Sequence, residues 1–128
     1  MIVVDTSVWV AALRSQTAPE AVTLRALLDA DEVGLPVPVR AEILSGASRA
    51  DSGGLKRVLS ALPILYPTDE TWALIEGWID RAARRGERFG MGDLLIAGVC
   101  AEAGALMWSL DADFPRMSRL KFIGLYEP

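Results

Sequence analysis

The sequence predicts an α/β fold with a mostly parallel sheet, because short apolar runs alternate with segments of helical periodicity. The first run, Ile2–Val4, consists of three branched apolar residues, which is typical of a strand buried on both faces. Further runs of this kind are found at 33–35, 64–66 and 105–108. The chain has 128 residues without repeats or linkers, so we expect a single domain over residues 1–128.

Helices are expected between these strands. Their predicted ranges are 7–13, 17–30, 38–46, 55–62, 69–85 and 93–103, with a turn or short helix at 115–119. The segment Thr17–Glu20 has the spacing of a capping box with proline in the first turn. In the longest helix, Trp72, Ile75, Ile79 and Ala82 recur every three or four residues, so they are expected to form its buried stripe.

Three short segments complete the prediction. Residues 48–54 are polar and glycine-rich, which predicts a mobile loop. Residues 86–92 are also rich in glycine and predict a break between two helices. Phe122 and Ile123 are expected to form a last edge strand.

The composition limits the chemistry that the chain can perform. It has no histidine, which excludes Ser-His-Asp and Cys-His machinery and zinc sites with histidine ligands. Oxygen ligands remain available, and these suit Mg²⁺ or Mn²⁺. The net charge of −4 argues against nucleic-acid binding through a general basic surface. It is compatible with a nucleic-acid substrate held through bound cations and a local basic patch.

Cysteine usage and hydropathy indicate the compartment. The single cysteine, Cys100, excludes an internal disulfide framework and fits a reducing cytoplasm; we expect it to be buried and inert. No apolar run reaches the roughly 18 to 20 residues that a membrane span requires. The run at 2–4 is too short for a signal peptide and lacks a basic leader. We therefore expect a cytoplasmic protein that has no membrane partner.

Four acidic residues stand near element boundaries or inside apolar helices. Asp5 follows the first strand, Asp111 follows a late strand, Asp93 opens an apolar helix and Glu42 lies within another. In α/β sheets ligands bind at the carboxyl ends of the strands, so these acids can meet at one edge. A divalent cation removes the repulsion between clustered carboxylates, activates water and stabilises charge on a phosphoryl group. The pattern therefore indicates hydrolysis of a phosphodiester or a related bond.

Each acid also has a purely structural interpretation. Asp5 and Asp93 can act as helix caps, and Glu42 can face solvent. Asp111 and Asp113 can form a turn, the commonest use of such residues. It is the joint order and spacing of the acids that favours a shared site.

This order resembles the PIN-domain family and, within it, the VapC-type toxins of type II toxin–antitoxin (VapBC) pairs. The matching segments are 4–8, 40–46, 92–97 and 109–114, so the resemblance runs the whole length of the chain. It implies a three-layer α/β/α sandwich with a central, mostly parallel sheet. It also implies a metal-dependent endoribonuclease toxin that cuts transfer or ribosomal RNA. Such toxins usually form homodimers, and a cognate VapB-type antitoxin covers their groove with its C-terminal segment.

The resemblance also assigns candidate site residues. Four of them match the acidic quartet of the family, which holds Mg²⁺ or Mn²⁺: Asp5, Glu42, Asp93 and Asp111. Asp113 matches an additional acid found in many members, and Thr6 or Ser7 matches the hydroxyl that supports the first aspartate. Ser109 stands where the family usually has threonine and keeps the hydroxyl.

Basic and apolar residues suggest where partners bind. Four arginines gather at the end of the longest expected helix: Arg81, Arg84, Arg85 and Arg88. They can simply complement the helix C-terminus, or Arg84, Arg85 and Arg88 can contact the RNA backbone beside the acids. Apolar residues within 9–13 are candidates for receiving an antitoxin helix.

Two other classes of function stay open at this point. In a phosphotransfer enzyme with Asp5 as nucleophile, a second aspartate two residues on, or a paired acid and a well-placed lysine, is expected. Position 7 is serine, and the only lysines are Lys56 and Lys121. A catalytically silent PIN-like interaction module is the other class. Loss of an acid would indicate it, and all four are present.

Overall fold

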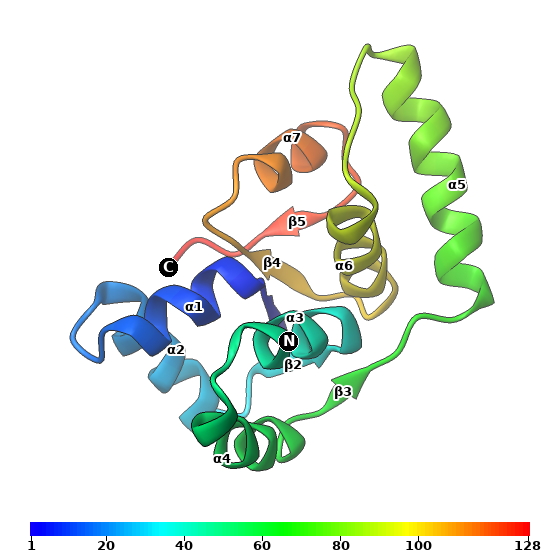
Figure 1. Ribbon diagram of the computed structural model, residues 1–128. Coiled ribbons are helices and arrows are strands. Elements are labelled where there is room, and N and C mark those ends of the chain that lie inside the picture. Colours follow the sequence, from blue (N-terminus) through cyan, green and yellow to red (C-terminus); the bar gives the residue numbers. More distant parts are fainter.

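The computed structural model describes residues 1–128 and contains one sheet of five strands (Figure 1). The strands are β1 (Ile2–Val4), β2 (Val33–Pro36), β3 (Ile64–Leu65), β4 (Leu106–Trp108) and β5 (Gly124–Leu125). Their order is β3-β2-β1-β4-β5, and every neighbouring pair is parallel. The expected parallel sheet is therefore confirmed, and β1 is its central strand.

Seven helices connect the strands, and those that flank the sheet give a three-layer α/β/α sandwich, while α5 packs outside it against α6 (Figure 1). They are α1 (Thr6–Arg14), α2 (Pro19–Asp29), α3 (Val37–Gly46), α4 (Arg49–Ser60), α5 (Asp69–Arg84), α6 (Met91–Glu102) and α7 (Asp113–Arg119). None of the helices combines the length and the apolar character that crossing a membrane requires.

The core fixes the two helices that carry candidate acids. All residues of β1 and β2 are buried, and Cys100 on α6 is buried as expected. On α7, Phe114 and Met117 are completely buried and hold this short helix against the sheet. α6 approaches α5 closely at Gly98, where an added Cβ would lie 3.0 Å from Thr71 Cγ2. Asp93 and Asp113, in the first turns of α6 and α7, therefore lie on tightly packed helices.

The prediction of a mobile loop at 48–54 is wrong, because most of this segment belongs to α4. Ser48 is the N-cap of the helix: its hydroxyl accepts a hydrogen bond from the Asp51 backbone N–H (3.2 Å) and donates one to Asp51 Oδ2 (2.9 Å). This cap stabilises the first turn by about 1 kcal/mol, which offsets part of the helix propensity lost at Gly53 and Gly54.

The buried face of α5 also differs from the predicted stripe. Its buried residues are Thr71, Ile75, Trp78 and Ala82. Trp72 and Ile79 are 46% and 44% exposed. The helix is rotated by about one residue from the expected orientation because Thr71 can be buried with its hydroxyl satisfied. That hydroxyl accepts from the Thr68 backbone N–H and donates to Glu102.

The predicted start of the second helix and the predicted position of the last strand are also wrong. The segment Thr17–Glu20 does not form a capping box, since the N-cap of α2 is Ala18 and has no side-chain bond. Phe122 and Ile123 are buried against the core, and the last strand lies directly after them at Gly124–Leu125.

Candidate active site

The site lies at the edge where β1 and β4 end. Val4 is in register with Trp108, and the Asp5 backbone N–H donates to the Trp108 carbonyl at 2.8 Å. The chain leaves β1 towards β2 on one side and returns in β4 on the other. The strand order therefore reverses between β1 and β4, the point at which ligand crevices form in open α/β sheets.

Asp5 is buried at this edge, with a residue exposure of only 5%. One carboxylate oxygen, Oδ2, accepts from the Ser7 hydroxyl (2.7 Å), the Ser109 hydroxyl (2.8 Å) and the Ser7 backbone N–H (3.3 Å). The last bond makes Asp5 the N-cap of α1. The other oxygen, Oδ1, has no hydrogen bond within the protein. Asp5 thus caps a helix with one oxygen and leaves the other available to a ligand.

The same two serine hydroxyls organise the turn after β4. Ser7 Oγ accepts from the Leu110 backbone N–H at 3.0 Å, and Ser109 Oγ accepts from the Asp111 backbone N–H at 2.9 Å. Asp111 Oδ1 in turn accepts from the Asp113 backbone N–H at 2.9 Å. The hydroxyls therefore tie the position of Asp5 to that of the two later acids.

Three acids converge beside Asp5. Carboxylate oxygens of Asp93, Asp111 and Asp113 lie within 4.8 Å of one another. The pKa of Asp93 is raised from 3.8 to about 7, first by burial and then by a hydrogen bond with Asp113 and the charges of Asp111, Asp113 and Asp5. Asp93 lies in the first turn of α6, whose N-cap is Gly90. The purely structural interpretation of Asp93 as a helix cap is therefore wrong.

The donor set fits a hard divalent cation. Every group in the cluster offers carboxylate oxygen, the ligand that Mg²⁺ and Mn²⁺ prefer. Without a cation, Asp93 holds a proton in a part of the molecules at neutral pH, because burial and then repulsion by the neighbouring carboxylates disfavour its ionised form. A cation would remove that repulsion.

Glu42 lies outside the group of three converging acids. It is exposed on α3, and its Oε1 accepts from the Thr6 hydroxyl at 3.1 Å. Thr6 therefore contacts Glu42, while Ser7 is the residue that supports Asp5. This chain of contacts, from Asp5 through its neighbour Thr6 to Glu42, is what connects Glu42 to the site.

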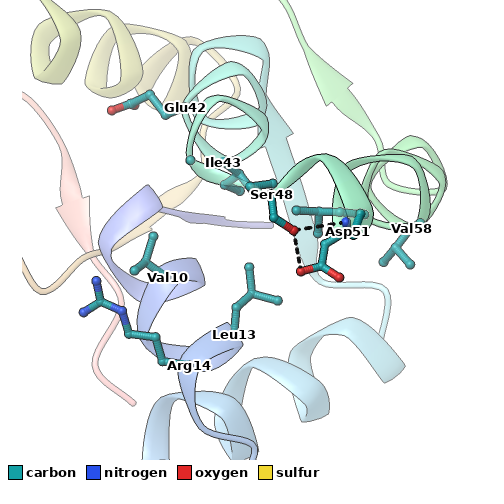
Figure 2. Close-up of a pocket in the computed structure, with 13 residues that line it drawn as sticks. Val10, Leu13, Arg14, Glu42, Ile43, Ser48, Asp51 and Val58 are labelled. Atoms are coloured by element: carbon teal, nitrogen blue, oxygen red, sulfur yellow. Dashed lines mark hydrogen bonds between the residues drawn. The ribbon is translucent and has the colours of Figure 1, made fainter.

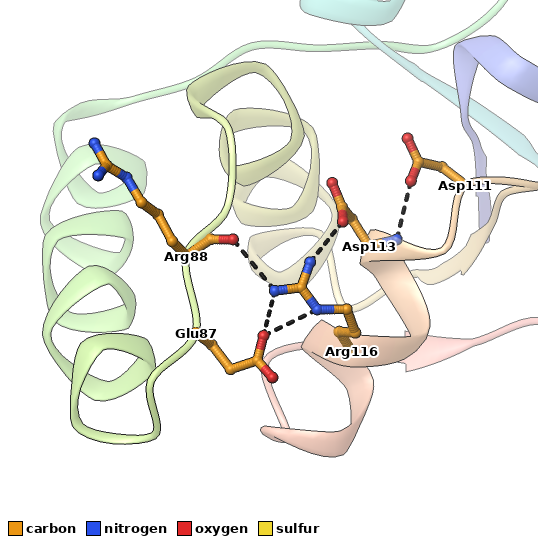
Figure 3. A network of polar contacts seen from close by, with 5 residues as sticks. All are labelled: Glu87, Arg88, Asp111, Asp113 and Arg116. Carbon is orange, nitrogen blue, oxygen red and sulfur yellow. Dashed lines mark hydrogen bonds and ion pairs between the residues drawn. The ribbon is translucent and has the colours of Figure 1, made fainter.

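Arg116 is a residue of the site that the sequence did not reveal (Figure 3). Its Nη1 donates to Asp113 Oδ1 at 2.7 Å, its Nε donates to Glu87 Oε2 at 2.9 Å, and its Nη2 donates to the Arg88 carbonyl at 3.3 Å. The guanidinium also lies 4.5 Å from the centre of the Phe89 ring. Arg116 thus fastens the segment before α6 to α7 and partly neutralises Asp113. Its position three residues after Asp113 on a helix was the only signal in the sequence.

The structure does not bring the predicted arginines to the acids. The Arg88 side chain points away from Asp111 and Asp113, as Figure 3 shows. Arg84 pairs with Asp80 on the exposed face of α5 at 3.0 Å. Arg85 lines a separate pocket with Arg84.

The raised pKa of Asp93 gives the metal-free protein a distinctive pH dependence. Between pH 4 and about 7 folded Asp93 keeps a proton that the unfolded chain releases, so its contribution to stability falls as the pH rises. Asp93 is partly exposed, so screening reduces the effect to about 1 kcal/mol, or about 4 °C in the melting temperature. We therefore expect Asp93→Asn to raise the melting temperature in EDTA at pH 8 and to change it much less at pH 5.

Differential scanning calorimetry of both proteins at the two pH values measures this difference. Mg²⁺ at pH 8 is expected to stabilise the wild type and to have less effect on the variant. An equal shift from Asp93→Asn at both pH values would contradict the assignment of the proton to Asp93.

An α/β/α sandwich with aspartates gathered where the central strand ends is the architecture of an acidic, cation-binding site. The chain belongs to the PIN domain family, whose model matches residues 2–120. It is 37% identical, over 94% of its length and 93% of theirs, to the VapC ribonuclease Mb1587 of Mycobacterium bovis and to Ribonuclease VapC11 of Mycobacterium tuberculosis. These relatives confirm the family resemblance inferred from the sequence motifs.

Solved structures share the fold at lower identity. VapBC2 from Rickettsia felis, solved with a DNA fragment from its promoter, has a TM-score of 0.78 at 18% identity and 98% coverage of both chains. VapC20 from Mycobacterium tuberculosis, described as a toxin that cleaves the sarcin-ricin loop, has a TM-score of 0.65 at 20% identity. The alignment with VapC20 covers 99% of this chain and 100% of the other. The three-layer fold expected from the sequence is thus confirmed.

Proposed function

We propose that the protein is a metal-dependent endoribonuclease toxin that hydrolyses RNA phosphodiester bonds and is neutralised by a cognate VapB-type antitoxin. The observation that carries this proposal is the convergence of Asp93, Asp111 and Asp113 within 4.8 Å beside buried Asp5. The PIN domain family and relatives named VapC ribonucleases support RNA as the substrate class. All four acids of the predicted quartet are present, which disfavours a silent interaction module.

In this proposal the acids hold Mg²⁺ or Mn²⁺ directly or through water. Asp5 contributes its unbonded Oδ1, and Asp93, Asp111 and Asp113 contribute the neighbouring carboxylates, with Glu42 at the margin. When bound, the cation activates water for attack and stabilises negative charge on the phosphodiester. The serine hydroxyls keep Asp5 oriented, and Asp93 gives up its proton when the cation binds.

The decisive test is RNA cleavage by the purified protein. Total cellular RNA is incubated with the protein and Mg²⁺, Mn²⁺ or EDTA, and the cut ends are sequenced. We expect cleavage at defined sites in transfer or ribosomal RNA with either metal, and none in EDTA. Cleavage that continues in EDTA would contradict the proposed mechanism.

An apolar groove beside Glu42 supports an antitoxin partner (Figure 2). The groove has a volume of about 710 Å³ and lies between α1, α3 and α4. Val10, Leu13 and Ile43 face it in Figure 2, and Leu13 and Val58 are 56% and 59% exposed. Because Glu42 lines the groove, we propose that an apolar antitoxin segment lies here and reaches the acidic site.

Leu13→Asp is expected to weaken binding of the cognate antitoxin about tenfold, since a charged group would be buried against an apolar surface. RNA cleavage by the free variant should stay unchanged. Isothermal titration calorimetry measures the affinity, and Val22→Asp, at an exposed position of α2 outside the groove, is the matched control. Equal weakening by both variants would argue against this groove.

We further propose that the protein acts as a homodimer in the cytoplasm. The exposed Trp72 and Ile79 on α5 offer an apolar face to a second copy. Light scattering of the purified protein reports its mass in solution.

A further inference from the structure

A second pocket, away from the groove of Figure 2, is lined almost entirely by basic residues. Its volume is about 320 Å³, and it forms where the C-terminal ends of α5 and α7 meet. The lining residues are Arg81, Arg84, Arg85, Arg119, Leu120 and Lys121. We call this the basic pocket. Five of the 13 lysines and arginines of an acidic chain gather here without an acid in the lining, so the positive charge is local.

Two of these cations have structural roles. Arg81 donates to the Leu120 carbonyl at 2.9 Å and lies 5.0 Å from the centre of the Phe122 ring, so it joins α5 to the end of α7. Arg84 pairs with Asp80 at 3.0 Å. Attraction to the carbonyls at two helix C-termini explains why cations accumulate here, but it leaves the remaining three without specific partners.

Those three are Arg85, Arg119 and Lys121. All are exposed, and none makes a side-chain hydrogen bond or an ion pair. They come from two elements far apart in sequence and converge on one concavity, which provides several N–H donors for a single anion. Guanidinium and ammonium groups arranged in this way match the oxygens of a phosphate.

Lys121 has an unusual backbone for a lysine. Its φ is 63°, in the left-handed region, and it follows Leu120, the C-cap of α7. Glycine is favoured at such a position, because a Cβ there crowds the following carbonyl oxygen. The chain thus keeps an ammonium group where the backbone alone favours glycine.

The basic pocket is linked to the acidic cluster through α7. This helix begins at Asp113 and ends at Arg119, so its seven residues span about 10 Å. Arg116, between them, clamps the segment that leads from α5 to Asp93. An RNA strand that follows α7 from the acids therefore reaches the basic pocket within a few nucleotides.

We propose that the basic pocket binds a backbone phosphate of the RNA, a few nucleotides from the bond that is cut, through Arg85, Arg119 and Lys121. The inference rests on the proposed ribonuclease function and adds the position of the substrate strand. Among the candidate contacts to the RNA backbone, Arg119 and Lys121 take the place of Arg88, whose side chain points away from the acids.

Binding is measured without cleavage, in the Asp93→Asn background and in EDTA, with a short fluorescein-labelled single-stranded RNA of mixed sequence. Fluorescence anisotropy at 50 to 200 mM salt gives the affinity and its salt dependence. We expect Arg119→Gln with Lys121→Gly to weaken binding about tenfold and to reduce the salt slope by about 0.7 for each cation that no longer pairs with a phosphate. Glycine suits the backbone at 121, so the fold should be retained.

Lys56→Gln, which removes the only other lysine from an exposed position on α4, is the control. Unchanged affinity in the Arg119→Gln/Lys121→Gly protein, or equal weakening by Lys56→Gln, would overturn the proposal that the basic pocket binds RNA. Cleavage is scored separately, in Mg²⁺ or Mn²⁺ and with Asp93 intact. If the protein binds the probe through this pocket but cuts no RNA, RNA binding by the pocket is supported and only the proposed ribonuclease function is overturned.

Discussion

Replacing Asp93 with asparagine is expected to lower the rate of RNA cleavage by at least about 100-fold, because even residues that only orient ligands change activity 10- to 100-fold. The substitution removes one of three carboxylates that lie within 4.8 Å. It keeps the shape of the side chain and removes a repulsive charge, so the protein should remain folded and become more stable at pH 8 without metal. Single-turnover cleavage in Mg²⁺ measures the rate, and circular dichroism verifies the fold.

Asp29→Asn is the matched control for this variant. Asp29 is exposed at the end of α2, and its replacement should leave the cleavage rate unchanged. Wild-type activity in a folded Asp93→Asn protein would show that the acidic cluster is not the active site, or that a contaminating nuclease cuts the RNA.

Removing both serine hydroxyls is expected to have the next largest effect. Ser7→Ala with Ser109→Ala should lower cleavage at a fixed Mg²⁺ concentration about 100-fold, about tenfold from each hydroxyl. Both hydroxyls donate to Asp5 Oδ2, and they also accept from the backbone N–H groups of Leu110 and Asp111. Without them a buried carboxylate loses its strongest donors and the turn after β4 loses two anchors.

This loss should appear as weaker metal affinity, which distinguishes it from general unfolding. A Mg²⁺ titration of the cleavage rate should shift to higher concentration, and excess Mg²⁺ should recover part of the activity. Ser109→Thr keeps the hydroxyl and should retain most of the activity, whereas Ser15→Ala, at an exposed position after α1, should change nothing. An unshifted titration in the double variant would refute the positioning role of the serines.

The acids at strand ends could be anticipated because their placement depends on local patterns. Ile2–Val4 and the apolar run before Asp111 each predict a strand, and parallel strands bring their carboxyl ends to one edge. The start of α4 was harder to predict as a helix, because Ser48 favours a helix while Gly53 and Gly54 oppose it.

Features that require two distant segments to meet were not predictable from local patterns. The Arg116–Glu87 contact and the basic pocket both depend on how the segment around α5 packs against α7. The face of α5 was ambiguous for a related reason: the expected and observed stripes share Ile75 and Ala82. Burial of Thr71 decided between them, and it depends on the partner Glu102 on α6.

Asp5 both lies in the acidic site and caps α1, so inactivating the protein at Asp5 and at Asp93 should have different effects on its stability. Loss of the Asp93 charge relieves repulsion, so it should yield a durable, inactive protein that still occupies the antitoxin. Loss of the Asp5 carboxylate removes the cap of α1 and the acceptor of two serine hydroxyls, so it should also shorten the lifetime of the chain in the cell. Where an intact copy is also present, selection against toxicity would then favour survivors mutated at Asp5, because a durable Asp93 variant would withdraw antitoxin from the active molecules.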